Sequence, residues 1–515
     1  MTARPSISKR LEIDDLAAAV AAQRAAGRIV VHCHGVFDLL HIGHLRYLKG
    51  AKALGDVLVV TLTPDRFVDK GPFRPAFDED LRLEAMAALE AVDYVALNRW
   101  PTAEETLRLV RPDVYAKGAE FQAAGADPTG KMELERAVAA EVGCEVAFID
   151  DVVYSSSQLI NRHLPIYPEA VTRYLDAQRA EVPLENVLEL LDGLKDLRVL
   201  VVGDVILDEY VYVETLGKAS KDPALAVRHL SEERFAGGAA AVANHLAAFG
   251  ARVDLISVVG DDANGHSGDG ADFLRDHLAA SVTAHFVRRR GASTVRKRRF
   301  VDAYASNKLL SVYTMETAPA GEEVVAELRG AVDGVATSVD LVVCADYGHG
   351  AVPTTLVSHL ASLDAFLAVN TQANAGNRGF HTVTRYPRAD LVCLAEHEIR
   401  LETRDSEGAL RPMMSELAEA LGTSLFIVTR GKRGSLALGG GDFHEAPALA
   451  SKIVDRVGAG DAFFALAALA ARAGASPALV SMLGNAAGAQ GVEIVGNRRS
   501  IDAARLRKQL TAMLK

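Results

Sequence analysis

The sequence predicts an α/β protein of two domains joined by a helical linker, and three observations support this prediction. Its 515 residues exceed what one hydrophobic core usually accommodates. Short apolar runs typical of buried parallel strands alternate with helical patterns over residues 1–163, and the same alternation returns over residues 197–515. Between these regions, residues 164–196 carry charged helical segments interrupted by prolines, which is typical of a linker.

Composition limits the classes of protein to which this chain can belong. Hydrophobic residues make up 49% of the sequence, so the whole chain can fold. The 56 basic and 67 acidic residues give a formal charge of −11, which disfavours nonspecific binding to nucleic acid. We therefore expect small-molecule partners, with anions bound by local basic groups, and no nucleic acid.

Cysteine usage and hydropathy predict a cytoplasmic protein. The four cysteines are far apart in the sequence and form no C-x-x-C pair, so they indicate neither a disulfide framework nor a zinc site. This usage fits a reducing cytoplasm. Residues 1–10 lack the apolar stretch of a signal peptide, and no apolar run reaches the roughly 18 residues of a membrane span. We expect no membrane partner.

The first phosphate site is predicted at a turn from a strand to a helix. Residues 29–31 are apolar and end a strand pattern, and apolar residues recur at helical spacing over residues 45–54. The turn carries His41 and His44 at the helix start, where exposed amides and the helix dipole attract phosphate. Two imidazoles there can donate hydrogen bonds to a polyphosphate and stabilise charge as its α-phosphorus is attacked. A pair of ordinary capping or core histidines is the alternative.

Residues 35–44 resemble the G-x-F-D-x-x-H-x-G-H signature of the cytidylyltransferase-like nucleotidyltransferases, which join a nucleoside triphosphate to a phosphorylated alcohol or sugar and release pyrophosphate. The resemblance implies a Rossmann-like domain in which His41 and His44 bind the triphosphate. Further nucleotide contacts are implied for Gly35, Phe37, Asp38, Lys52, Lys70, Arg82, Lys117, Ser155, Ser156 and Ser157. For each of the three basic residues at 52, 70 and 82, a solvated surface charge is the alternative. His34 stands where relatives often carry Asn or Tyr, so its role stays open.

The second phosphate site is predicted in the C-terminal region, at a glycine-rich helix start. Residues 455–461 read Asp-Arg-Val-Gly-Ala-Gly-Asp and open an apolar helix that extends to about Arg472. Backbone amides from Gly458 to Asp461 can hold the negative charge that develops on a transferring phosphoryl group. Asp461 is placed to take the proton from an attacking hydroxyl. A tight turn without function is the alternative interpretation of such a glycine pair.

Residues 455–461 resemble the D-x-x-G-A-G-D signature of the ribokinase-like (PfkB) sugar kinases, and the similarity extends from about Arg198 to the end of the chain. The resemblance implies a ribokinase-like α/β domain with a small β lid over residues 211–235, and Asp461 as the catalytic base. Sugar contacts are implied for Asp208, Gly237 and Gly238. An anion hole and ATP site are implied for Gly458, Ala459, Gly460, Thr429, Gly431 and Asn485, with Glu398 as a weak candidate metal ligand.

Several residues depart from the kinase pattern. Ala241 replaces an Asn that follows the paired glycines in relatives, and Ala395 replaces the Asn of an N-x-x-E element. Asn370, Arg456 and Val457 also differ from the family. The domain is then either a kinase for a different sugar or a kinase fold kept as a binding or dimerising module.

Two basic runs and one histidine are open to more than one interpretation. Residues 288–290 and 296–299 lack the interleaved aromatic residues of a nucleic-acid site. They predict either a solvated face or one or two side chains that reach the phosphate of a sugar. His349 is predicted to be a surface or core residue, with a contact to substrate phosphate as the alternative.

Both domains on one chain resemble the bifunctional heptose kinase/nucleotidyltransferase family, which makes nucleotide-activated heptose for bacterial surface polysaccharide. The domain order is reversed here, because the transferase comes first. The resemblance implies a sugar-phosphate kinase that uses ATP, a sugar 1-phosphate nucleotidyltransferase that uses ATP or CTP, Mg²⁺ as cofactor, and a possible homodimer through the lids. One alternative is a cytidylyltransferase for a polyol phosphate such as glycerol 3-phosphate, with an inactive kinase domain. Another is a non-catalytic sensor of nucleotide and sugar phosphate.

Overall fold

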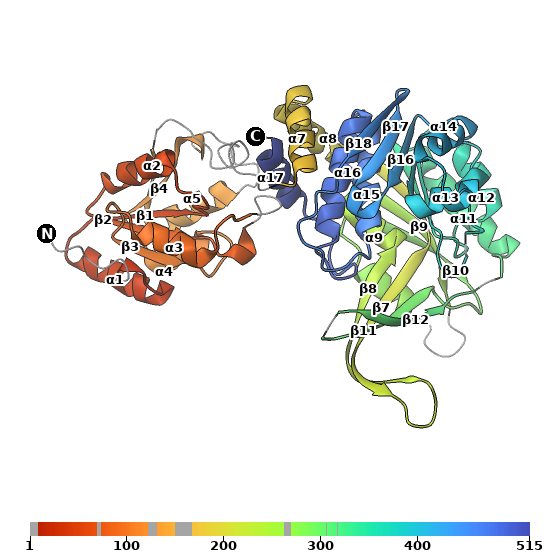
Figure 1. Cartoon of the computed structure of the whole chain (residues 1–515), viewed down its shortest axis with the longest axis horizontal. Helices are drawn as coiled ribbons and strands as arrows, with labels where there is room; N and C mark the ends of the chain where they lie inside the picture. The colour runs from red at the N-terminus through yellow and green to blue at the C-terminus, as the bar shows by residue number, and fades with distance from the viewer. Residues whose placement is uncertain are drawn as a thin grey trace. The chain divides into compact units, whose positions relative to one another are not determined.

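The computed structural model describes residues 9–68, 74–121, 131–149, 167–261, 269–304, 306–316, 318–377 and 379–514 (Figure 1). The chain divides into two compact units. The first comprises Met1–Leu184 together with Ala504–Lys515, and the second comprises Glu185–Ala503. Each unit has its own parallel sheet and its own hydrophobic core, so the predicted α/β class is confirmed.

A five-stranded parallel sheet in the order β3-β2-β1-β4-β5 forms the centre of the first unit. Its strands are β1 (Val30–Gly35), β2 (Val57–Leu62), β3 (Tyr94–Leu97), β4 (Val114–Gly118) and β5 (Glu145–Ile149). Its helices are α1 (Ile13–Ala25), α2 (Ile42–Lys52), α3 (Glu79–Ala87), α4 (Glu104–Val110) and α5 (Lys131–Glu141). The strand order reverses between β1 and β4, and ligands of such sheets bind outside the carboxyl ends at this reversal.

Alternating side chains along the central strands explain why helices cover both faces of this sheet. Val31 and Cys33 of β1 pack with Leu48 of α2 on one face. Val30 packs with Leu16 of α1 on the other face. All of β2 is buried, as expected for a parallel strand covered on both sides. The buried strands therefore hold the start of α2 at the carboxyl end of β1.

Three helices lie near the boundary between the units: α7 (Glu169–Glu181), α8 (Leu184–Gly193) and α17 (Ala503–Leu514). The predicted linker is helical where it is described, in α7, α8 and the 3-10 turn Leu194–Asp196. The Arg179 Nε donates a hydrogen bond to the Met513 carbonyl oxygen at 3.0 Å, which ties α17 to α7. The end of the chain thus groups with the first unit, whereas the sequence analysis placed it in the second domain. Among the helices of the described ranges, none combines the length and apolarity needed to cross a membrane.

A nine-stranded sheet in the order β10-β9-β6-β13-β14-β15-β16-β17-β18 forms the centre of the second unit. The strands from β10 to β16 pair in parallel, and β17 and β18 extend one edge in antiparallel fashion. They are β6 (Arg198–Gly203), β9 (Arg252–Gly260), β10 (Val282–Arg289), β13 (Leu341–Asp346), β14 (Phe366–Thr371), β15 (Leu391–Ala395), β16 (Leu425–Thr429), β17 (Ser435–Gly439) and β18 (Asp442–Ala446). The order reverses between β6 and β13, so a ligand crevice is expected at their carboxyl ends.

Helices cover both faces of the nine-stranded sheet (Figure 1). One face carries α9 (Ala239–Ala247), α15 (Ala459–Arg472) and α16 (Pro477–Gly491). The other carries α11 (Glu322–Ala336), α12 (Thr354–Ala361), α13 (Glu396–Thr403) and α14 (Leu410–Ala420), and α10 (Asp269–Asp276) follows β9. The alanine-rich α15 is buried from Ala462 to Ala470, because it lies between the sheet and the neighbouring helices α9 and α16.

The predicted small β lid is present and is larger than expected. β7 (Val205–Lys218) and β8 (Leu225–Gly238) form a long antiparallel hairpin that projects from the second unit (Figure 1). β11 (Arg296–Asp302) pairs in parallel with β7, and β12 (Lys308–Thr314) completes a four-stranded sheet. The basic run 296–299 is therefore part of the lid, which the sequence did not predict because β11 is far from β7 along the chain.

Candidate active sites

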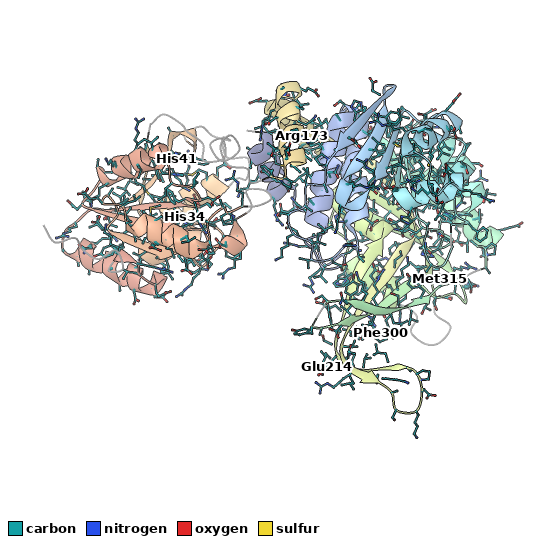
Figure 2. The ribbon with its side chains drawn as sticks, viewed as in Figure 1. His34, His41, Arg173, Glu214, Phe300 and Met315 are labelled. Carbon is teal, nitrogen blue, oxygen red and sulfur yellow. The ribbon has the colours of Figure 1, made fainter. Side chains whose placement is uncertain are left out.

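His41 and His44 meet at the start of α2, as the motif predicts. His41 is the N-cap residue of α2, and its Nδ1 accepts a hydrogen bond from the Gly43 N–H at 3.1 Å. The two imidazole rings are close, with centroids 4.1 Å apart. Burial lowers the pKa of His41, so the ring is neutral at pH 7, and its proton is on Nε2 because Nδ1 accepts. Figure 2 labels His34 and His41 in the first unit.

A polar network lies beneath this turn, at the carboxyl ends of β1 and β2. His34 Nδ1 lies 2.9 Å from the Thr61 hydroxyl, and His34 Nε2 lies 3.3 Å from the Thr63 hydroxyl. His32 Nε2 contacts the same Thr61 hydroxyl at 2.8 Å. Thr61 lies beside His34 because of the parallel register of β1 and β2. The sequence left His34 without a role, and pairing between the strands supplies these partners.

Three of the predicted nucleotide contacts shape the turn after β1. The Asp38 carboxylate is buried and accepts hydrogen bonds from the Ala76 and Phe77 N–H groups at 2.7 and 3.1 Å. Phe37 has a positive φ of 47°, and its ring meets His44 edge-on with centroids 5.4 Å apart. The same ring lies close to Gly35, where an added Cβ would be only 3.1 Å from the nearest ring carbon. Phe37 therefore packs against His44, and Asp38 holds the segment at residues 76 and 77 next to this turn.

Arg82 differs from the prediction of a triphosphate ligand. Its guanidinium is buried and donates hydrogen bonds to the Val36, Thr63 and Phe77 carbonyl oxygens and to Asp65 Oδ1, at 2.5, 2.9, 3.1 and 2.6 Å. A cation that makes four such contacts holds α3 against the loops after β1 and β2. Arg82 therefore orders the site and is not a surface charge either.

Lys52 is also placed differently from the prediction. Its Nζ donates to Asp93 Oδ2 at 2.5 Å and to the Asp56 carbonyl oxygen at 2.6 Å. Asp93 accepts a hydrogen bond from the Leu58 N–H at the start of β2. Lys52 therefore lies at the amino ends of the parallel strands, whereas His41 lies at their carboxyl ends. The sequence does not show this separation. It arises because α2 begins at the carboxyl ends of the strands and finishes at their amino ends.

Lys117 follows the expected position at the carboxyl end of β4, next to the reversal of strand order. Its Nζ forms an ion pair with Glu135 at 2.7 Å and lies 5.0 Å from the centroid of the Tyr115 ring. Glu135 of α5 also accepts a hydrogen bond from the Tyr115 hydroxyl at 3.0 Å. The predicted contacts at Lys70, Ser155, Ser156 and Ser157 lie outside the described residues.

The glycine-rich start of α15 has the form of an anion hole. Gly458 is its N-cap residue, with φ at 83°, and a Cβ there would lie 2.2 Å from the Asn497 Oδ1. Only glycine fits this combination of positive φ and close approach. Ala459, Gly460 and Asp461 follow in the first turn, where backbone amides have no acceptor within the helix.

Asp461 has the environment of a base. Its Oδ1 accepts a hydrogen bond from the Tyr347 hydroxyl at 2.8 Å. Burial raises the pKa of Asp461 to about 6, a shift that the Tyr347 hydrogen bond opposes and the Asp208 charge reinforces. A carboxylate with this pKa is ionised at pH 7 and still accepts a proton readily. Tyr347 directly follows β13, so tertiary structure brings it to Asp461.

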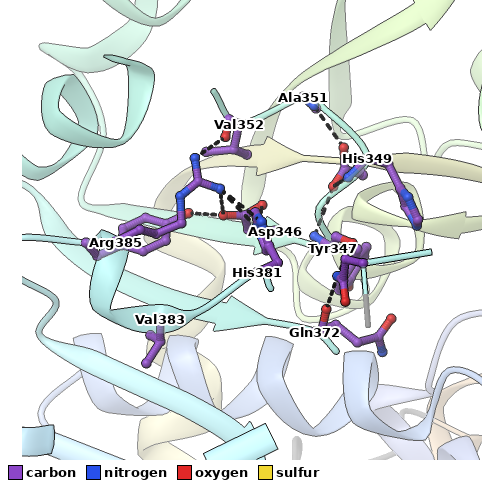
Figure 3. Close-up of polar contacts among 12 residues, drawn as sticks. Asp346, Tyr347, His349, Ala351, Val352, Gln372, His381, Val383 and Arg385 are labelled. Atoms are coloured by element: carbon purple, nitrogen blue, oxygen red, sulfur yellow. Dashed lines mark hydrogen bonds and ion pairs between the residues drawn. The ribbon is translucent and has the colours of Figure 1, made fainter. Parts of the chain in front are cut away.

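Asp204 fixes the loop after β13, which Figure 3 shows. Its buried carboxylate accepts hydrogen bonds from the N–H groups of Tyr347, His349 and Ala351 at 2.9, 3.1 and 2.9 Å. Burial raises the pKa of Asp204 to about 6, and the nearby Asp346 charge adds to this. This loop holds Tyr347 in place beside the base.

Asp346 is held from the other side of the same loop. It is buried and contacts His381 Nε2 at 2.6 Å, the Tyr386 hydroxyl at 2.7 Å and the Arg385 guanidinium at 3.2 Å (Figure 3). All three partners come from the segment after β14. The sequence could not predict these partners of Asp346, because they are remote from it along the chain.

The predicted sugar residues meet at the base of the lid. Asp208 of β7 forms an ion pair with Arg299 of β11. A Cβ on Gly237 would lie 2.3 Å from the Asp208 Oδ2, so the glycine gives this carboxylate its space. Gly238 has φ at 62°, and a Cβ there would lie 2.2 Å from the Asp204 carbonyl oxygen. Ala241 is buried in α9.

Asp455 joins the lid to the anion hole. It accepts hydrogen bonds from the Tyr210 hydroxyl of β7 and from the Lys308 Nζ of β12, both at 2.6 Å, and from the Gly496 N–H at 3.0 Å. Burial alone would raise the pKa of Asp455, but these hydrogen bonds outweigh it, and the pKa is lowered. The first aspartate of the motif therefore connects two elements that the sequence keeps apart.

Thr429, Gly431 and Asn485 surround the ends of β16 and β17. The Thr429 hydroxyl donates to the Leu394 carbonyl oxygen at 3.4 Å, and Gly431 has φ at 57°. The Asn485 Nδ2 donates to the Ser435 hydroxyl at 2.7 Å. Asn485 thus packs α16 against β17.

Glu398 caps α13 instead of presenting a carboxylate to a metal. Its Oε2 accepts from the Ala395 N–H at 2.6 Å and its Oε1 from the Ala373 N–H at 3.1 Å. Burial raises the pKa of Glu398 to about 7, although both hydrogen bonds favour the ionised form. Within the described ranges, no group of three or more His, Cys, Asp or Glu residues is arranged to hold a metal ion.

Comparisons with known proteins agree with the two units. Residues 196–504 match the family model of the pfkB family carbohydrate kinases, and residues 32–162 match the cytidylyltransferase-like model. The predicted order of the two domains is thereby confirmed. A solved structure of a mutant phosphofructokinase-2 from Escherichia coli has a TM-score of 0.50 and 17% identity, covering 62% of this chain and 100% of that chain. At that identity, the likeness shows the fold alone.

Curated relatives share shorter stretches. The bifunctional protein HldE of Trichlorobacter lovleyi is 44% identical over 124 residues, which cover 24% of this chain and 25% of that protein. The bifunctional protein HldE of Methylobacillus flagellatus is 39% identical over 158 residues, 30% of this chain and 31% of that protein. The chain therefore spans between a quarter and a third of the length of these relatives.

Proposed function

We propose that this chain, which belongs to the pfkB family of carbohydrate kinases and carries a cytidylyltransferase-like domain before the kinase domain, is a bifunctional enzyme that makes a nucleotide-activated sugar. The kinase half phosphorylates a sugar phosphate. The transferase half joins a sugar 1-phosphate to a nucleoside triphosphate and releases pyrophosphate. The observation that carries the proposal is the presence of two helix starts suited to phosphate, at His41 and at Asp461. Similarity to bifunctional proteins named HldE, together with the resemblance to the heptose enzymes, favours an ADP-heptose-like product for surface polysaccharide.

In the transferase half, the two histidines act on the triphosphate. Neutral His41 donates its Nε2 proton in a hydrogen bond to a phosphate oxygen, and His44 binds beside it. Both stabilise the charge that grows at the α-phosphorus while an oxygen of the sugar phosphate attacks. Pyrophosphate leaves directly, so no covalent enzyme intermediate is required.

In the kinase half, Asp461 takes the proton of the attacking sugar hydroxyl while the oxygen bonds to the γ-phosphorus of ATP. The amides at the start of α15 stabilise the transferring phosphoryl group, and ADP leaves. Tyr347 orients the Asp461 carboxylate through its hydrogen bond. Each of these groups belongs to the second unit.

Magnesium enters the proposal as part of the nucleotide substrate. Mg²⁺ at nucleotide sites is held mainly by substrate phosphates, waters and one or two carboxylates. Glu398 accepts one backbone N–H on each of its oxygens, so a contact from this carboxylate to the metal would use its remaining lone pairs. We therefore propose that Mg²⁺ arrives bound to ATP and screens the negative charge of its phosphates.

The partners of the protein and its cytoplasmic location stay predictions. Exposed apolar side chains on the lid support the proposed homodimer, since a strand edge with such residues favours pairing. They are Leu216, Leu225, Leu230, Leu310 and Val312.

The test is pyrophosphate release by the purified chain with Mg²⁺, crossing ATP, CTP, GTP and UTP against heptose 1-phosphate, other sugar 1-phosphates and glycerol 3-phosphate. We expect release with ATP and heptose 1-phosphate, and ADP formation that depends on heptose 7-phosphate. Release only with CTP and a polyol phosphate, without sugar-dependent ADP, would favour a cytidylyltransferase with an inactive kinase domain. Binding without turnover of any pair would favour a sensor.

A further inference from the structure

Lys297 is a buried cation without a bonded counter-ion in the described part of the chain. It lies on β11 opposite Asp208 of β7, and only 5% of its surface is exposed. No described carboxylate approaches its Nζ closely enough for an ion pair, whereas its neighbour Arg299 is paired with Asp208. Its Nζ lies 5.3 Å from the centroid of the Tyr313 ring, a cation–π contact that leaves its charge without a counter-ion. A buried ammonium without a counter-ion is costly, which suits a site for a ligand of opposite charge.

Strand pairing places Lys297 beside Asp208 on the sugar side of the kinase site. It interacts electrostatically with Asp208, Asp204 and the base Asp461, which favour its charged form. Burial outweighs them and lowers the pKa of Lys297. Asn497 links this part of the lid to the start of α15, because its Nδ2 donates to the Asp208 Oδ2 at 3.5 Å and a Cβ on Gly458 would lie 2.2 Å from its Oδ1.

His349 supplies a second nitrogen that lacks a partner. Its backbone N–H is held by Asp204 at 3.1 Å, and its loop is flanked by Gly348 and Gly350, both with positive φ (Figure 3). Within the described ranges, the buried Nε2 of its ring has no hydrogen-bond partner. Burial and then the charge of Lys297 lower the pKa of His349 to about 3, so the ring is neutral.

We propose that Lys297 and His349 form the subsite for the phosphate group that the acceptor sugar already carries before Asp461 acts on it. This rests on the proposed function and names its acceptor class, a sugar phosphomonoester. The two nitrogens come from the lid and from the loop after β13, so the ligand bridges two elements. A dianion there gives the ammonium a counter-ion and gives the Nε2 of His349 an acceptor, which neither has in the described protein.

Steady-state kinetics of the full chain test the subsite. Wild type, Lys297→Met and His349→Ala are compared on a heptose 7-phosphate and on the same sugar without phosphate. We expect the ratio of kcat/KM for the two acceptors to fall about tenfold to hundredfold in Lys297→Met, as for loss of a charge-assisted contact. His349→Gln, which keeps a donor near the position of Nε2, should recover most of the loss seen in His349→Ala. Lys221→Met, at the exposed tip of the lid hairpin, should match wild type.

The outcomes separate this inference from the proposed function. An equal loss of kcat on both acceptors would assign Lys297 to the transferring phosphoryl group and overturn the subsite. If no acceptor supports ADP formation in wild type, the kinase proposal fails, and calorimetric titration with inorganic phosphate decides the subsite alone. Loss of one class of phosphate site in Lys297→Met would support it, and an unchanged titration would refute it.

Discussion

At the scale of single residues, the base Asp461 is tuned by groups far from it in the sequence. Burial raises its pKa to about 6, and the Tyr347 hydrogen bond holds that value down. A general base works only when deprotonated, so sugar-dependent ADP formation should fall as the pH is lowered through about 6. Above that pH, the carboxylate is ionised, and the rate of ADP formation should no longer depend on pH.

Replacing Tyr347 with Phe should move this acid limb to higher pH. The hydroxyl stabilises the ionised carboxylate, and a hydrogen bond to a charged group contributes about 1.5 kcal/mol, which corresponds to about one pH unit. The measurement is kcat/KM for the sugar across the limb. Tyr94→Phe, which removes a hydroxyl that accepts from Gln23 in the first unit, is the control. An unshifted limb in a folded Tyr347→Phe protein would mean that this hydroxyl does not tune the base.

At the scale of elements, the close approach of β8 to β7 sets the sugar side of the kinase. Gly237→Ala would place a Cβ 2.3 Å from the Asp208 Oδ2, so the carboxylate must move. We expect KM for the sugar to rise about tenfold, because a contact of roughly 1.4 kcal/mol is lost, while KM for ATP stays unchanged.

A matched glycine gives the control for this substitution. A Cβ on Gly330 of α11 would meet nothing within 4 Å. Gly330→Ala should therefore leave both KM values unchanged and raise stability by about 0.5–1 kcal/mol, since alanine favours a helix. Equal KM values for the sugar in Gly237→Ala and wild type would show that Asp208 does not contact the sugar.

At the scale of the whole molecule, the two candidate sites belong to separate compact units. His41 and His44 lie in the first, and Asp461 lies in the second. A substitution in one site should therefore lower the activity of that site and leave the other activity unchanged. Asp461→Asn should lower sugar-dependent ADP formation by about 10²–10⁴-fold and leave pyrophosphate release intact. His44→Ala should do the reverse.

Both activities are to be measured in both variants, with circular dichroism to verify folding. Loss of both activities in a folded single variant would mean that the sites are not independent. Near-normal pyrophosphate release in folded His44→Ala would remove that histidine from the transferase mechanism.

Patterns along the sequence were enough to predict the α/β class, the two helix starts at His41 and Asp461, and the lid hairpin. These depend on patterns local to the chain, such as apolar periodicity and glycines beside a helix start, which short segments already express. The order of the two domains, transferase-like before kinase-like, was also readable from the motifs.

The side chains that surround those motifs are set by contacts between segments that are remote along the chain. Arg82 and Lys52 make contacts that their predicted roles did not include. The loops after β1 and β2 accept hydrogen bonds from the Arg82 guanidinium, and Asp93 accepts one from Lys52. The contact of Tyr347 with Asp461 was not predicted, since sheet order brings the two together from remote segments. Strand pairing likewise places Lys297, a member of the basic run 296–299, beside Asp208. Hydrogen bonds and burial depend on distance in space, so contacts between remote segments cannot be identified from local sequence patterns.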